Sequence, residues 1–216
     1  ALLASSNVQQ ALDLGCVAHL SAIKSRIPFL HFFDGFRTSH EMQKIEVIEY
    51  DELAKIVDWD AIKAFRDNAL NPDHPVLRGT TINPDIFFQQ REAVNKFYIP
   101  IPEIVENYMN EINKLTGRNY KPFNYYGSET AEEIIVAMGS GCDALRETIT
   151  YINENMNANI SLLEVHLYRP FSAEYFLKVM PKTVKRICVL DRTKEPGAGA
   201  EPLCLDVKNI FFGKAD

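Results

Sequence analysis

The chain has 216 residues, of which 46% are hydrophobic, so it can bury a core as one large domain or as two smaller ones. Its net charge of -6 and pI near 5.4, with no cluster of Lys and Arg, argue against nucleic-acid binding, which needs a concentrated basic face. No apolar run approaches the roughly 20 residues of a membrane span and no signal peptide is visible, so we expect a soluble, intracellular protein.

The four cysteines are scattered along the chain and form no C-x-x-C pair. They are Cys16, Cys142, Cys188 and Cys204. Zinc and iron–sulfur sites usually need tightly spaced ligands, so we expect free thiols in a reducing compartment. The histidines are equally scattered, and no metal site is expected.

Because the chain starts with Ala inside a helical pattern, we expect a fragment of a longer protein.

The N-terminal segment combines a helical pattern with a strand pattern. Residues 1–25 have apolar residues near helical spacing. Residues 27–36, "IPFLHFFDGF", are apolar on both faces, which is typical of a strand buried inside a parallel sheet. Asp34 lies near the C-terminal end of this strand, where open α/β sheets hold their ligands. A short strand is predicted within residues 45–50.

The middle of the chain is predicted to be helical, with one long connector. Residues 51–68 have the spacing of an amphipathic helix. Three prolines and a glycine in residues 71–85 exclude a helix or a central strand there. Residues 86–96 and 98–116 follow as helices, and Gly117 is suited to end the second one. We expect a domain boundary near residue 120.

The C-terminal part alternates between strands and helices. The predicted strands are residues 134–138, 161–168 and 186–190, and the predicted helices are residues 143–154 and 172–180. This order is a βαβαβ unit with a parallel sheet. The predicted fold class is therefore α/β, with an incomplete parallel-sheet segment at the N-terminus followed by a βαβαβ three-layer domain.

The turn "GSGC" follows the first strand of that unit. Gly139, Gly141 and Ala144 match the G-x-G-x-x-G/A pattern of a dinucleotide-binding turn, so Gly139, Ser140 and Gly141 are candidates for an anion site. The second strand lacks the acidic residue that would hold a ribose, although Arg169 is placed to meet the 2′-phosphate of NADP. The alternative is a glycine turn that lets a helix pack close to its strand.

Polar residues follow two other predicted strands. Asp34, Arg37 and His40 form either a small polar cluster or, through "RTSHE", a helix cap with salt bridges. Asp191 and Arg192 end the last strand before a Gly-rich loop and face either an interface or a ligand.

Four separated blocks carry a family resemblance over essentially the whole chain. They are "SSNVQQALDLGCVAHLSAIKSRIPFLHFFDGFRTSHE", "AMGSGC", "LYRPFS" and "VLDRTKEPGAGAEPLCLDV". In this order they resemble pyruvate:ferredoxin (or flavodoxin) oxidoreductase. The resemblance implies a large enzyme that decarboxylates pyruvate on thiamine diphosphate with magnesium. It passes electrons through [4Fe-4S] clusters to ferredoxin or flavodoxin and yields acetyl-coenzyme A.

The resemblance also implies a division of the chain. Residues 1–50 resemble the rear of the pyrimidine-binding thiamine diphosphate domain, residues 51–119 are a helical and Pro-rich connector, and residues 120–216 resemble the transketolase C-terminal domain. The family's activating glutamate lies upstream of this chain. Asp34-Gly35 lacks the first glycine and the later asparagine of the diphosphate and magnesium motif. The fragment alone is therefore expected to hold no catalytic residue, to bind no cofactor and to be inactive.

The implied partners are the remaining domains of the enzyme, pyruvate, coenzyme A, ferredoxin or flavodoxin, and a second copy in a homodimer. The implied location is the cytoplasm, or a mitochondrion-related organelle in an anaerobic eukaryote. The alternative function is a free-standing NADP-binding, Rossmann-like dehydrogenase domain.

Overall fold

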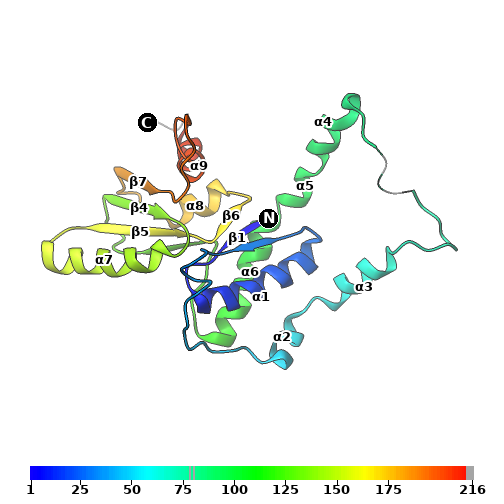
Figure 1. Cartoon of the computed structure of the whole chain (residues 1–216), viewed down its shortest axis with the longest axis horizontal. Coiled ribbons are helices and arrows are strands. Elements are labelled where there is room, and N and C mark those ends of the chain that lie inside the picture. Colours follow the sequence, from blue (N-terminus) through cyan, green and yellow to red (C-terminus); the bar gives the residue numbers. More distant parts are fainter. Residues whose placement is uncertain (78, 80, 213–216) are drawn as a thin grey trace.

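The computed structural model describes residues 1–77, 79 and 81–212, in which two sheets organise the helices (Figure 1). The helices of these residues are α1 (Val8–Ser25), α2 (Tyr50–Ile56), α3 (Trp59–Asp67), α4 (Pro84–Ala93), α5 (Asn95–Tyr98), α6 (Ile101–Thr116), α7 (Gly141–Met156), α8 (Ala173–Val179) and α9 (Pro202–Phe211). The strands are β1 (Leu2–Ala4), β2 (Leu30–Phe32), β3 (Phe123–Tyr126), β4 (Glu133–Ala137), β5 (Ile160–Val165), β6 (Leu167–Arg169) and β7 (Arg186–Leu190).

The first sheet pairs two strands of the N-terminal segment with one strand from residues 167–169. β1 is its central strand, parallel to β2 and antiparallel to β6. α1 and α6 pack against it and share one apolar core with β1 and β6. The predicted helix over residues 1–25 is wrong for its first residues: Leu2–Ala4 form a strand, and the helix begins at Val8 because the Asn7 side chain caps it by accepting from the amide of Gln10 at 2.9 Å.

The prediction of a doubly buried strand at residues 27–36 is also wrong. β2 has three residues, lies at the edge of its sheet, and leaves Leu30 61% exposed. Residues 45–49 form no strand, and helix α2 begins at Tyr50. An apolar run alone did not distinguish a central strand from an edge strand, because that difference depends on neighbouring strands.

The connector between the sheets contains the predicted helices, with one break. The helix predicted for residues 51–68 divides into α2 and α3, since Asp58 turns its side chain to accept from the amide of Ala61 at 2.8 Å and starts α3. α4 and α5 cover the next predicted helix. α6 ends where Gly117 takes a left-handed conformation with φ 72°, which confirms its predicted role.

The second sheet confirms the predicted βαβαβ unit. Its strand order is β3-β5-β4-β7, with β4 parallel to both β5 and β7. Alternate residues of β4 point into two separate cores, one with α7 and one with α8 and α9, so the sheet lies between two helical layers. The antiparallel strand β3 and the helix α9 were not predicted.

The strand predicted for residues 161–168 is interrupted. It divides at His166 into β5, in the second sheet, and β6, which leaves to pair with β1. The chain thus passes directly from one sheet to the other at His166 and connects them.

Within residues 1–77, 79 and 81–212, no helix is long and apolar enough to cross a membrane. All four cysteines are free thiols.

Candidate functional site

Three strand ends meet at one place between the two sheets. β4 lies between β5 and β7 in the second sheet. After β4 the chain continues into α7 on one face of this sheet, whereas after β7 it continues into α9 on the other face. The C-terminal ends of β4 and β7 thus form a topological switch point, where open α/β sheets place their ligands. The loop after β2 reaches the same place and brings Asp34.

Asp34 occupies the position that an anion would take on the glycine turn. Its Oδ2 accepts a hydrogen bond from the backbone amide of Ser140 at 2.5 Å. The Arg192 guanidinium lies 2.5 Å from its Oδ1 and donates to the Ser140 hydroxyl at 2.9 Å. Gly139 has φ 83°, and a Cβ there would lie 2.8 Å from the Asp34 carboxylate. The turn therefore binds a carboxylate of its own chain.

The charge of Asp34 is stabilised by these contacts. Partial burial by itself raises the pKa of this carboxyl group. The hydrogen bonds from Ser140 and the positive charge of Arg192 outweigh that effect and hold the pKa below its ordinary value. At neutral pH the turn therefore already carries a bound negative charge.

The space beside this cluster is small. A cavity of about 150 Å³ is lined by the ends of β2, β4 and β7, including Asp34, Gly139 and Arg192. Pockets for drug-sized ligands and cofactors usually measure about 300–1,000 Å³. Asp191 lines the same cavity, but its Oδ2 accepts from the amide of Leu203 at 2.7 Å and so caps the first turn of α9.

A diphosphate does not fit the turn as it stands. Asp34 would repel it, and the Arg192 guanidinium beside the turn is already paired with Asp34. Within the described residues no group of three or more His, Cys, Asp or Glu side chains is arranged to hold a metal ion.

Two of the predicted site residues lie elsewhere. Arg37 is exposed, and its carbonyl oxygen accepts from the amides of His40 and Glu41 in a series of turns, so "RTSHE" starts no helix. Arg169 stacks over the ring of Tyr168 at 4.0 Å and forms an ion pair with Asp206 of α9 at 2.8 Å. Both arginines therefore lie outside the cluster around Asp34.

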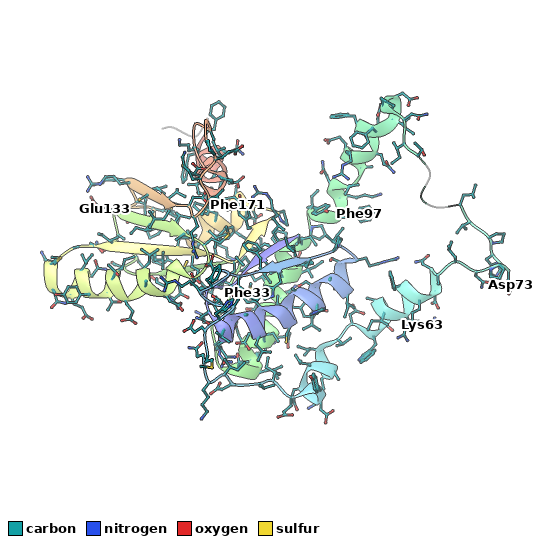
Figure 2. The ribbon with its side chains drawn as sticks, in the orientation of Figure 1. Phe33, Lys63, Asp73, Phe97, Glu133 and Phe171 are labelled. Atoms are coloured by element: carbon teal, nitrogen blue, oxygen red, sulfur yellow. The ribbon has the colours of Figure 1, made fainter. Side chains whose placement is uncertain are left out.

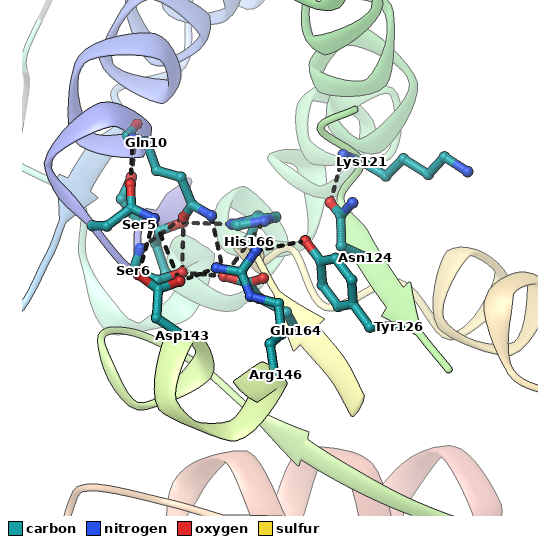
Figure 3. A network of polar contacts seen from close by, with 12 residues as sticks. Ser5, Ser6, Gln10, Lys121, Asn124, Tyr126, Asp143, Arg146, Glu164 and His166 are labelled. Carbon is teal, nitrogen blue, oxygen red and sulfur yellow. Dashed lines mark hydrogen bonds and ion pairs between the residues drawn. The ribbon is translucent and has the colours of Figure 1, made fainter. Parts of the chain in front are cut away.

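Sequence reasoning missed a second polar cluster, at the junction of α1, α7 and β5 (Figure 3). Glu164 is fully buried on the α7 face of the second sheet. It accepts hydrogen bonds from the Ser6 hydroxyl and, at 3.4 Å, from the Gln10 side chain. His166 Nε2 lies 3.8 Å from the same carboxylate, while its Nδ1 lies 3.0 Å from the Ala4 carbonyl oxygen.

The cluster joins the two sheets through charge as well as hydrogen bonds. Burial by itself raises the pKa of Glu164, but His166, Ser6 and Arg146 outweigh it and lower the pKa. Asn7, the cap of α1, also donates to Asp143 of α7 at 3.1 Å. The available signal was a single glutamate within the apolar strand "SLLEVHLY", where a charged residue needs partners.

Next to these clusters, the Ser5 hydroxyl lies 2.7 Å from Nε2 of His31. In both clusters polar groups pair across the boundary between the first and the second sheet, but Glu164 Oε2 and His166 Nε2 are buried without a hydrogen-bond partner among the described residues. The contacts of the two clusters hold the first and the second sheet in a fixed position relative to each other.

Comparisons with known proteins cover both parts of the chain. Residues 1–110 match the family described as "Pyruvate flavodoxin/ferredoxin oxidoreductase, thiamine diP-bdg", and residues 131–215 match "Pyruvate:ferredoxin oxidoreductase core domain II". A pyruvate-flavodoxin oxidoreductase of Klebsiella pneumoniae is 61% identical over 100% of the chain, and a pyruvate:ferredoxin oxidoreductase of Moorella thermoacetica is 57% identical over 98%.

The chain spans only a small part of these relatives. It covers 18% of the length of each of those two proteins. It covers 11% of a pyruvate dehydrogenase [NADP(+)] of Cryptosporidium parvum, which is 49% identical over 98% of the chain.

The fold has a counterpart among solved structures. A 2-oxoglutarate:ferredoxin oxidoreductase from Magnetococcus marinus, solved with 2-oxoglutarate, coenzyme A and succinyl-CoA bound, superposes with a TM-score of 0.53 at 16% identity. The match covers 90% of this chain and 35% of that one. The two family matches follow each other in chain order and include every strand except β3, and the chain belongs to the pyruvate flavodoxin/ferredoxin oxidoreductase family.

Proposed function

We propose that this chain is an internal segment of an enzyme that oxidatively decarboxylates pyruvate to acetyl-coenzyme A and passes the electrons to ferredoxin or flavodoxin. The observation that carries this proposal is similarity along the whole chain: 61% of 216 residues are identical in a pyruvate-flavodoxin oxidoreductase. Because the identity continues through both sheets, it supports the same role for both parts of the segment.

Within that enzyme, the segment has a structural role next to the cofactor. Residues 1–50 complete the rear of the pyrimidine-binding thiamine diphosphate domain, residues 51–119 connect, and residues 120–216 form a transketolase C-terminal-like domain. The bonds of Asp34 to Ser140 and Arg192 support this role, since they tie the loop after β2 to the second sheet.

The cofactors are held by other parts of the enzyme. Thiamine diphosphate, magnesium and [4Fe-4S] clusters need a diphosphate motif, an activating glutamate and closely spaced cysteines. The carboxylate on the glycine turn and the separation of Cys16, Cys142, Cys188 and Cys204 along the chain support their placement outside this segment. We propose further that the enzyme is a homodimer and acts in the cytoplasm, or in a mitochondrion-related organelle of an anaerobic eukaryote.

The experiment uses the full-length protein that contains this sequence. Purified with thiamine diphosphate and magnesium, it is expected to reduce flavodoxin or ferredoxin only when both pyruvate and coenzyme A are present. Omitting either substrate is the internal control. Reduction driven by another 2-oxo acid and not by pyruvate would contradict the proposed substrate, and the absence of any reduction would contradict the proposed enzyme class.

A further inference from the structure

Helices α3, α4 and α5 form an arm outside both sheets, and its first helix, α3, lies beside α1, where the Arg26 guanidinium is 5.7 Å from the centre of the Phe65 ring. None of their residues is buried. The three apolar cores found among the described residues contain no residue of these helices. Figure 1 shows α3 and α4 apart from the sheets and from each other, and Figure 2 labels Lys63 on α3 and Phe97 on α5. The arm therefore has no core of its own.

The arm nevertheless carries large apolar side chains. Those that are at least half exposed are Trp59, Phe65, Ile86, Phe87, Phe88 and Phe97. Single exposed apolar residues are common on protein surfaces, but a concentration of aromatic rings on three consecutive helices marks an interaction surface.

The pattern on α4 indicates a partner that surrounds it. Ile86, Phe87 and Phe88 are consecutive, so their side chains point in directions about 100° apart around the helix axis. A helix that is apolar on more than one side is normally buried on more than one side. Helices of ten residues are also marginal in water without packing.

We infer that the arm docks into a concave apolar surface formed by another part of the same polypeptide, outside these 216 residues. This inference rests on the proposed function. The chain spans 18% of relatives of the same family, so most of the enzyme is available as the occupant. The alternative occupant is the second copy of the proposed homodimer, and the test below distinguishes the two.

The test is site-specific photocrosslinking in the full-length enzyme. Phe88, which is 70% exposed, is replaced by p-benzoylphenylalanine, and Tyr151 on α7, which is 62% exposed, serves as the matched control. Illumination of the Phe88 variant is expected to leave the polypeptide at its monomer mass on a denaturing gel. Peptide mapping is expected to join residues 84–93 to a sequence outside the 216 residues, with a higher yield than at Tyr151.

Two results would overturn the inference. A product of twice the polypeptide mass would assign the arm to a second copy, and a yield at Phe88 no higher than at Tyr151 would mean that nothing encloses α4. If the Phe88 variant does not fold, the same replacement at Phe97, which is 50% exposed, decides the question. Pyruvate-dependent reduction of flavodoxin or ferredoxin by the unmodified enzyme is measured separately. If no reduction occurs, the proposed function is rejected, whereas the docking of the arm is still decided by the crosslinks.

Discussion

The Asp34 carboxylate accepts a hydrogen bond of 2.5 Å from the backbone amide of Ser140, which lies 106 positions further along the chain. The bond places a negative charge of the protein on a turn whose sequence matches an anion-binding pattern. It also ties the loop after β2 to the first turn of α7. Asp34 is therefore best described as a residue that connects the two sheets.

Removing the Asp34 carboxylate is expected to destabilise the fold. Asp34→Ala removes both the bond from Ser140 and the pair with Arg192, and we expect a loss of about 1–3 kcal/mol in the free energy of unfolding. Asp34→Asn keeps an oxygen for Ser140 and should lose less. Urea unfolding followed by circular dichroism measures both. Arg37→Gln, in the same loop, is the control and should change stability by under about 0.5 kcal/mol.

Acid should weaken this contact. The folded pKa of Asp34 lies below its ordinary value of 3.8, so the unfolded chain takes up the proton at a higher pH than the folded chain does. The contribution of Asp34 to stability is therefore complete above pH 3.8 and is lost as the pH falls through the folded pKa. Unfolding titrations of the wild type and Asp34→Asn should converge in that range. Curves that stay parallel as the pH falls would contradict this account.

The two glycines of the turn should respond differently to alanine. Gly139→Ala forces a side chain into a left-handed conformation and within 2.8 Å of Asp34, and it should cost at least about 1–2 kcal/mol. Gly141 has open space at its Cβ position and begins α7, so Gly141→Ala should be neutral within about 0.5 kcal/mol or slightly stabilising. Equal effects at the two positions would show that the turn is not held as described.

Glu164→Gln tests the second cluster. The substitution keeps the size of the side chain but removes the charge that accepts from Ser6 and faces His166. We expect a loss of about 2 kcal/mol, because a buried hydrogen-bonded charge is replaced by a group that satisfies fewer of its partners. Glu147→Gln on the exposed surface of α7 is the control. If both variants unfold at the same urea concentration as the wild type, the cluster adds no stability.

Local patterns predicted the elements of the second sheet well. The strands at β4 and β7 and the helices at α7 and α8 follow from apolar periodicity and from the turns between them. Family resemblance was equally informative, since the four quoted blocks are spread over both sheets. The glycine pattern at residues 139–141 correctly indicated a turn between a strand and a helix.

Long-range pairing could not be predicted in the same way. Nothing local to Leu2–Ala4 shows that these residues lie between β2 and β6, because their partners are 28 and more than 160 positions away. The occupant of the glycine turn was unpredictable for the same reason, as Asp34 reaches it through the first sheet. The buried charge of Glu164 was visible in the sequence, whereas its partners Ser6 and Gln10 were not.

The most direct test of the account is the size of the native polypeptide. An antibody raised against this segment is used to blot an extract of the source cells under denaturing conditions. An internal segment of a large oxidoreductase predicts a single band several times heavier than the 24.6 kDa of this chain. A band at 24.6 kDa would contradict that claim and would mean a free-standing protein.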